Sequence, residues 1–146
     1  MDGRHCRNWI RLEKIILNEQ QKQILLDHAE HEKPNESCAI LFGSENQNMA
    51  TVEKIFLTKN IEESPVNFTI SPEERLEADK IERETGFKIV AIFHSHPNSE
   101  AQPSNTDRKF MELNPEVWII LSGMSKQFRA FTLEKEILIE TNHDFA

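Results

Sequence analysis

Residues 87–107, FKIVAIFHSHPNSEAQPSNTD, join a short apolar run to a polar cluster. The apolar part, residues 87–93, has Lys88 as its one charged residue, which predicts a strand buried on both faces of a sheet. The polar part begins with His94 and His96. Side chains two residues apart on a strand point to the same side, about 6.6 Å apart along it. We therefore expect both imidazoles to project together from the end of a central strand.

Hydrophobic periodicity, together with residues that begin or end helices and strands, predicts the other elements. Strands are expected at residues 11–17, 37–43, 50–57, 117–121, 128–133 and 136–140, and helices from Asn18 to before Pro34, over 71–86 and over 104–113. Asn18 with Gln21, and Ser71 with Glu74, are typical helix starts. The order β-α-β-β-α-β-α-β-β-β favours an α/β fold with a single mixed β-sheet flanked by helices.

Three local details complete the predicted fold. The first helix is expected to place Ile24, Leu25 and His28 on one face, and the last helix to turn Phe110 and Leu113 inward. Residues 44–48 (SENQN) are expected to form the loop of a hairpin.

Length, net charge and composition limit the classes of protein to which this chain can belong. With 146 residues we expect one domain, 1–146, with about 1–9 and 141–146 flexible. The net charge of −8 argues against nucleic acid or an anionic membrane surface as partner. No apolar run approaches the ~18 residues of a membrane span, and the start lacks the apolar segment of a signal peptide. Two cysteines without a CxxC pair agree with a reducing, cytoplasmic location.

The polar cluster is a candidate metal site. His94 and His96 can converge on one ion, and Asp107, in the first turn of the following helix, is the candidate third ligand. Three protein ligands with an open position are typical of catalytic zinc, although two histidines and a carboxylate also hold iron. A second interpretation stays open, because Ser104 and Asp107 match a helix capping box and histidines are often structural.

A metal-activated water also needs a nearby base. Glu36 is the candidate, since it stands between the helix-ending Pro34 and a buried strand. The alternative is an ordinary acid at a strand edge.

Together these residues resemble the signature of the JAMM, or MPN-plus, metallopeptidases. That signature is an upstream glutamate followed by H-[S/T]-H-x7-S-x2-D, and here it is matched by Glu36, His94-Ser95-His96, Ser104 and Asp107. The flanking segments PNESCAILFG and NFTISPEE are also similar to the family, so the resemblance covers about residues 12–138. Ala39 stands where many relatives have glycine.

The resemblance implies an architecture like that of MPN domains and cytidine deaminases, and one Zn²⁺ per chain with a catalytic water as fourth ligand. His94, His96 and Asp107 would hold the zinc, and Glu36 would deprotonate the water and pass the proton to the leaving amine. Ser104 would help to stabilise the oxyanion. Ser95 lies between two ligands and is expected to point to the opposite face, in packing or hydrogen bonding.

The resemblance also implies the substrate. Members hydrolyse amide or isopeptide bonds at the C-terminus of ubiquitin-like or sulfur-carrier proteins, and the compact chain resembles the small prokaryotic type. Residues 59–68 are expected to shape the groove for the substrate tail, which would enter as an added strand. A non-catalytic MPN scaffold that binds partners is the alternative. A zinc deaminase is disfavoured because HxE and PCxxC are absent. The oligomeric state is not determined by the sequence.

Overall fold

The computed structural model describes residues 14–134 and 137–144, and its elements follow the expected order. They are β1 (Lys14–Ile16), α2 (Glu19–Glu32), β2 (Cys38–Asn46), β3 (Met49–Thr58), α3 (Pro72–Thr85), β4 (Lys88–His96), α4 (Asn105–Leu113), β5 (Val117–Ser122), β6 (Phe128–Glu134) and β7 (Ile137–Asp144). Part of the first predicted strand, residues 11–13, lies outside the described residues.

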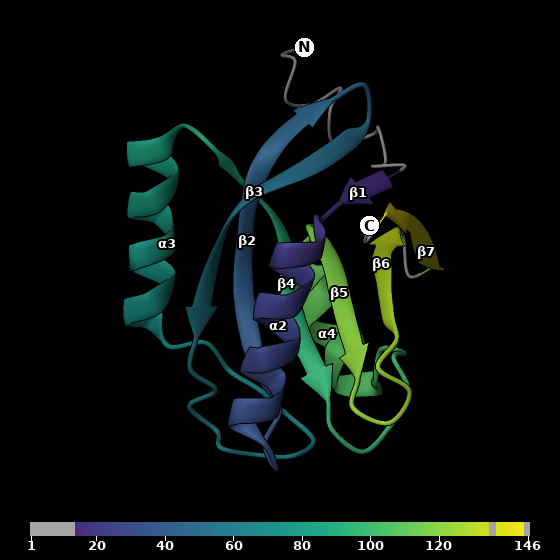
Figure 1. Ribbon diagram of the computed structural model, residues 1–146. Helices are drawn as coiled ribbons and strands as arrows, with labels where there is room; N and C mark the ends of the chain where they lie inside the picture. The colour runs from purple at the N-terminus through teal and green to yellow at the C-terminus, as the bar shows by residue number, and fades with distance from the viewer. Residues whose placement is uncertain (1–13, 135–136, 145–146) are drawn as a thin grey trace.

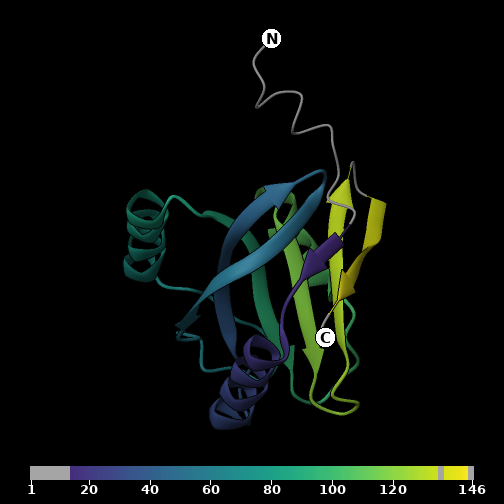
Figure 2. The same ribbon diagram turned by 45° about the horizontal axis from the view of Figure 1, so that its top comes forward.

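The strands form one curled mixed sheet in the order β1-β3-β2-β4-β5-β6-β7 (Figures 1 and 2). It closes on itself because β1 pairs in parallel with both β3 and β7. The central strand β4 is antiparallel to β2 and parallel to β5. The α/β fold with a mixed sheet and flanking helices is thus confirmed.

Two apolar cores lie on opposite faces of this sheet. In Figure 1, α2 crosses in front of the strands and α4 lies behind them. Residues of β2, β4 and β5 alternate between the two cores, so that Phe93 and Ile119 pack with Leu25 of α2, whereas Ile92 and Ile120 pack on the other face. Burial on both faces explains why these strands are almost entirely apolar.

The helix ends are as the sequence predicts. Asn18 and Gln21 form a reciprocal capping box at the start of α2. Ser71 accepts a hydrogen bond from the Glu74 N–H at the start of α3, and Gly86 ends that helix with a φ of 78°. Local side-chain chemistry is enough to determine these ends.

The predicted inward faces of two helices are wrong in part. In α2, Leu25 is buried, but Ile24 is 40% exposed. In α4, Phe110 and Leu113 are 38% and 78% exposed, and Met111 is buried instead. Asp107 points inward from the first turn of α4, and a residue four positions later lies on the same face. The inward carboxylate therefore sets the rotation of the helix.

Two predicted irregular segments are shorter than expected. Strand β2 continues to Asn46, so the hairpin turn is only Gln47 and Asn48, both at positive φ (53° and 66°). Residues 141–144, expected to be flexible, belong to β7 and pair with β6 and β1. Pairing on both sides orders this end of the chain, which periodicity alone does not reveal.

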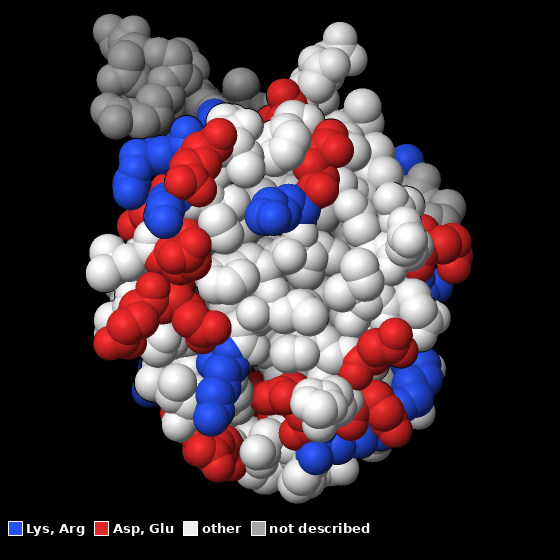
Figure 3. All heavy atoms as spheres, turned by 60° about the vertical axis from the view of Figure 1, so that its left-hand side comes forward, with Lys and Arg blue, Asp and Glu red and all other residues white. Residues whose placement is uncertain are grey.

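The surface carries charges of both signs. On the face shown in Figure 3, Lys and Arg are scattered among Asp and Glu, and uncharged side chains occupy the centre. This face has no gathering of basic residues of the kind that binds nucleic acid. Of the helices in the described residues, none has the length and apolar character needed to cross a membrane.

Gly43 allows the close approach of β2 and β3, and we predict that Gly43→Ala destabilises the fold. A methyl group there would overlap the Thr51 carbonyl oxygen, so the backbone has to shift. We expect the free energy of unfolding to fall by about 1–3 kcal/mol, measured by urea denaturation. Ser44→Ala, at the exposed neighbouring position, serves as the control and should change stability by less than about 0.5 kcal/mol. Equal stability of Gly43→Ala and wild type would contradict the prediction.

Candidate metal centre

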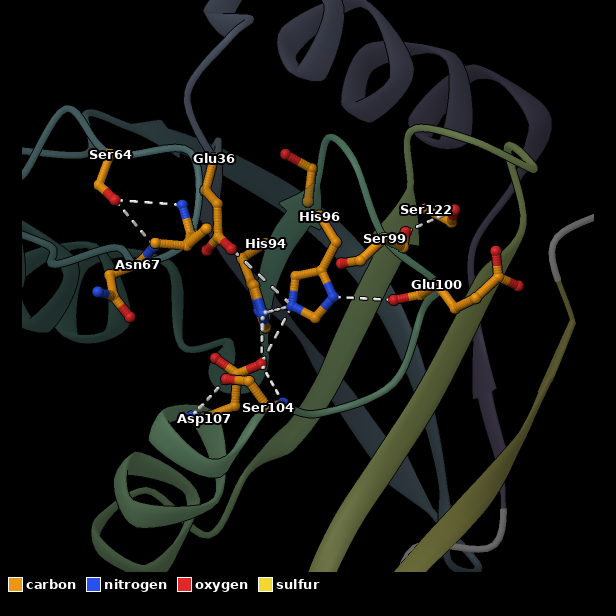
Figure 4. A network of polar contacts seen from close by, with 12 residues as sticks. Glu36, Ser64, Asn67, His94, His96, Ser99, Glu100, Ser104, Asp107 and Ser122 are labelled. Atoms are coloured by element: carbon orange, nitrogen blue, oxygen red, sulfur yellow. Dashed lines mark hydrogen bonds and ion pairs between the residues drawn. The ribbon is translucent and has the colours of Figure 1, made fainter.

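Three side chains from two elements meet at one buried point. His94 and His96 end β4, and Asp107 comes from the first turn of α4 (Figure 4). The two Nε2 atoms lie 3.0 Å apart, and each lies 3.1 Å from Asp107 Oδ2. All three residues are at most 5% exposed. The structure thus brings together the three ligands predicted from the sequence.

The capping and ligand interpretations of Asp107 are compatible. Ser104 caps α4: its Oγ accepts a hydrogen bond from the Asp107 N–H at 3.0 Å. In return, the Ser104 N–H donates to Asp107 Oδ2 at 2.9 Å. The same oxygen faces both histidines. The capping box therefore holds the carboxylate in the orientation that a ligand needs.

The spacing of the three atoms fits a small cation. With bonds of about 2.0 Å, the corners of a tetrahedral site are about 3.3 Å apart, close to the 3.0–3.1 Å seen here. Two imidazole nitrogens and a carboxylate oxygen all carry lone pairs. At this distance the lone pairs repel each other unless a proton or a cation lies between them, so the group could hold a divalent metal ion.

A hydrogen bond orients His96. Its Nδ1 lies 2.9 Å from the Glu100 carbonyl oxygen, an acceptor, so Nδ1 carries a hydrogen, and in the neutral ring the Nε2 lone pair faces the centre. Burial alone would lower the pKa of His96, but the hydrogen bonds to Asp107 and Glu100 and the nearby carboxylates raise it above its usual value.

Aromatic contacts orient His94. Its Nδ1 has no hydrogen-bond partner among the described residues. Instead the ring stacks on Phe68, with centroids 4.6 Å apart at 23°, and meets the edge of Trp118 at 5.7 Å. Burial lowers the pKa of His94 even though Asp107 opposes this effect, which favours the neutral imidazole that a metal binds. Trp118 is buried in the core as predicted.

Glu36 lies beside the three ligands. Its Oε2 is 4.0 Å from His96 Nε2, and its Oε1 has no hydrogen-bond partner among the described residues. Glu36, His94 and His96 offer ligand atoms that lie within 4.8 Å of one another, but Asp107 lies closer to both histidines. Burial raises the pKa of Glu36 to about 8, against the effect of His96.

The residues around the centre have structural tasks. Ser95 points away from the ligands, as expected, and its Oγ accepts a hydrogen bond from the Ser37 N–H at 2.9 Å. Cys38 is buried, which raises the pKa of its thiol to about 12. Sequence reasoning missed Phe68 and the Glu100 carbonyl, because neither a stacking contact nor a backbone acceptor leaves a pattern in the sequence.

Comparisons with known proteins agree with this geometry. Residues 18–134 match the family described as prokaryotic homologs of the JAB domain. A protein of Pyrococcus furiosus named desampylase is 34% identical over 101 residues, or 69% of either chain. The CysO-cysteine peptidase of Mycobacterium tuberculosis is 28% identical over 95 residues, which cover 65% of this chain and 64% of that one.

A solved structure shows the same fold. The solution structure of a protein from Desulfitobacterium hafniense has a TM-score of 0.82 and 29% identity, and the match covers 90% of this chain and 92% of that chain. The fold and the site define a hydrolase of the JAMM type. The chain belongs to the family of prokaryotic homologues of the JAB domain, so the predicted resemblance is confirmed.

We predict that Cys38 is unreactive in the folded protein. With a pKa of about 12, roughly one thiol in 10⁴ is ionised at pH 8, and the side chain is fully buried. In a Cys6→Ser background, 5,5′-dithiobis(2-nitrobenzoate) should label Cys38 only after unfolding in guanidinium. Native labelling at the rate of a free cysteine would contradict the burial of this thiol.

We predict that Phe68→Leu weakens metal binding, because the Nδ1 of His94 has no hydrogen-bond partner among the described residues that could replace the stacking contact. Loss of an orienting partner lowers metal affinity by about 10–100-fold. Competition between the protein and a chromophoric chelator for Co²⁺ measures the change. Val66→Ala, at a 67% exposed position of the same loop, is the matched control and should bind like wild type. Equal affinity for Phe68→Leu would show that stacking does not orient His94.

Proposed function

We propose that this protein is a zinc-dependent metallo(iso)peptidase that hydrolyses the amide or isopeptide bond at the C-terminus of a ubiquitin-like or sulfur-carrier protein. The observation that carries the proposal is the buried triangle of His94, His96 and Asp107, with the Glu36 carboxyl group beside it, 4.0 Å from His96 Nε2. The names of its relatives, desampylase and CysO-cysteine peptidase, support the substrate class.

In this proposal His94, His96 and Asp107 hold one zinc ion per chain. When bound, the zinc would supply Lewis-acid chemistry that lowers the pKa of a water to roughly 7. The three residues come from β4 and α4, and with three protein ligands a fourth position on the ion would stay open. Zinc is proposed in preference to iron because the resemblance to the JAMM metallopeptidases implies zinc.

Glu36 is the general base. Its Oε2 lies 4.0 Å from His96 Nε2, and neither a lysine nor an arginine among the described residues shares an ion pair with it. An oxygen of Glu36 takes the proton from the attacking water and gives it to the leaving amine. Burial keeps bulk water away, so the proton stays on Glu36 between the two steps.

Ser104 is proposed to donate to the substrate carbonyl oxygen. Its Oγ accepts the capping hydrogen bond from Asp107, which leaves the hydroxyl hydrogen available. The residue is exposed, so a substrate can reach it. Capping fixes where the hydroxyl sits before the substrate arrives, which is how an oxyanion donor becomes effective.

The substrate tail is proposed to lie along the loop of residues 59–68. This segment is irregular, as predicted, and it carries the exposed apolar side chains Ile61 and Val66, 48% and 67% exposed. Apolar side chains beside a buried site suit the C-terminal tail of a small protein.

A cytoplasmic location stays a prediction. A scaffold that only binds partners has no need for convergent ligands, so catalysis is preferred.

The test combines metal analysis with cleavage of isopeptide-linked conjugates of a ubiquitin-like protein from the same organism. Wild-type protein should contain one zinc per chain and cleave the conjugate, and a chelator should abolish cleavage until zinc is restored. Glu36→Gln should keep the zinc but lose about 10²–10⁴-fold in kcat, because the general base is absent.

Glu77→Gln, at an exposed position of α3, is the control and should cleave like wild type. Cleavage that survives both the chelator and Glu36→Gln would refute the mechanism. Stoichiometric iron in protein purified without added metal would refute the assignment of zinc as the metal, but not the rest of the mechanism.

A further inference from the structure

The side chain of Asn60 organises the loop that follows β3. It is 2% exposed, and its Oδ1 accepts hydrogen bonds from the N–H groups of Glu62 and Thr69, both at 3.1 Å. Its Nδ2 donates to the carbonyl oxygens of Glu36 at 3.1 Å and Asn67 at 2.9 Å. A longer contact of 3.4 Å joins Nδ2 to the Ser64 carbonyl oxygen, so both ends of the amide are satisfied within the loop and at Glu36.

The same loop holds Glu36 by its backbone. The Glu36 N–H donates to the Ser64 carbonyl oxygen at 2.8 Å, and its carbonyl oxygen accepts from Asn60. Glu36 precedes the first residue of β2, so these bonds replace the pairing that a strand would supply. Both polar groups of this residue's main chain are thus fixed by the loop, on the left of the centre in Figure 4.

The carboxylate of Glu36 has no comparable support. Its Oε1 has no hydrogen-bond partner among the described residues, and its Oε2 is 4.0 Å from His96 Nε2, beyond a hydrogen bond. The direction of this side chain therefore depends on where the main chain of Glu36 is held. A displacement of about 1 Å at a catalytic group can lower the rate by about 10²-fold.

We propose that Asn60 is a positioning residue that aims the Glu36 carboxylate by holding its carbonyl group, an inference that rests on the proposed function. An amide is required because Asn60 donates on one side and accepts on the other. Asn60 does not touch the metal ligands His94, His96 and Asp107, which are supported by β4 and α4. Its effect should therefore fall on kcat and not on metal affinity.

The decisive variant is Asn60→Asp. The aspartate has the same shape and still accepts from Thr69 and Glu62, so these two N–H groups keep their acceptor. Its second oxygen cannot donate, so the bonds to the carbonyl oxygens of Glu36 and Asn67 are lost and these oxygens are repelled. We expect kcat on the conjugate to fall about 10–100-fold, with KM and Co²⁺ affinity within about threefold of wild type.

Amide hydrogen exchange gives a readout that does not depend on activity. In Asn60→Asp, the Glu36 amide should exchange at least about tenfold faster than in wild type, because its acceptor, the Ser64 carbonyl oxygen, faces the new carboxylate instead of the Asn60 Nδ2. The Thr69 amide, whose acceptor is retained, should keep its protection. Unchanged protection of Glu36 would overturn the inference. Asn60→Ala is the second variant. It loses both the donor and the acceptor of the side-chain amide, so the Glu36 and Thr69 amides should both exchange faster.

Val52→Ala is the matched control for general destabilisation, since Val52 is buried in the other half of β3. Compared at a temperature where all variants are folded, it should keep the wild-type kcat. An equal loss of kcat in Val52→Ala, or a loss in Asn60→Asp that follows Co²⁺ affinity, would overturn the inference. If metal-loaded wild type cleaves nothing, the proposed function fails, and hydrogen exchange alone decides whether Asn60 holds Glu36.

Discussion

The structure depends on the meeting of three polar side chains inside an apolar environment. His94, His96 and Asp107 are buried with their lone pairs directed at one point, 3.0–3.1 Å apart. Buried polar groups are unfavourable unless they are satisfied, so β4 and α4 are matched to each other through this contact. The constraint reaches beyond the site, because the inward Asp107 decides which face of α4 packs on the sheet and leaves Leu113 in solvent.

The side chains of the centre are oriented in different ways. A carbonyl oxygen holds His96, aromatic rings hold His94, and the main chain holds Glu36. Phe68 and Asn60 belong to one loop, so a segment without regular structure supports both a ligand and the proposed base. Loops on a rigid scaffold often carry function in this way. Here the buried side-chain amide of Asn60 holds the loop by hydrogen bonds, as backbone pairing holds β4 in the sheet.

The fold could largely be predicted from short-range chemistry. Asn18, Ser71 and Gly86 mark helix ends because their side chains, or the lack of one, satisfy groups close by in the chain. Predictions that need the position of a distant partner were less accurate. The exposed Ile24 and Phe110 and the two-residue hairpin turn belong to this second kind, because packing against another element decides them.

By itself the sequence determined which residues can act as ligands, because a strand with two histidines at i and i+2 puts both imidazoles on one face, and a capping serine places Asp107 in the first turn of a helix. Only the tertiary structure decided that these groups meet, that Glu36 stands 4.0 Å from His96 without a direct bond, and that Phe68 and Asn60 complete the surroundings. The reason is physical: local hydrogen bonds act within a few residues, whereas convergence needs the fold to bring together residues that are 11 (His96 and Asp107) to 60 (Glu36 and His96) positions apart.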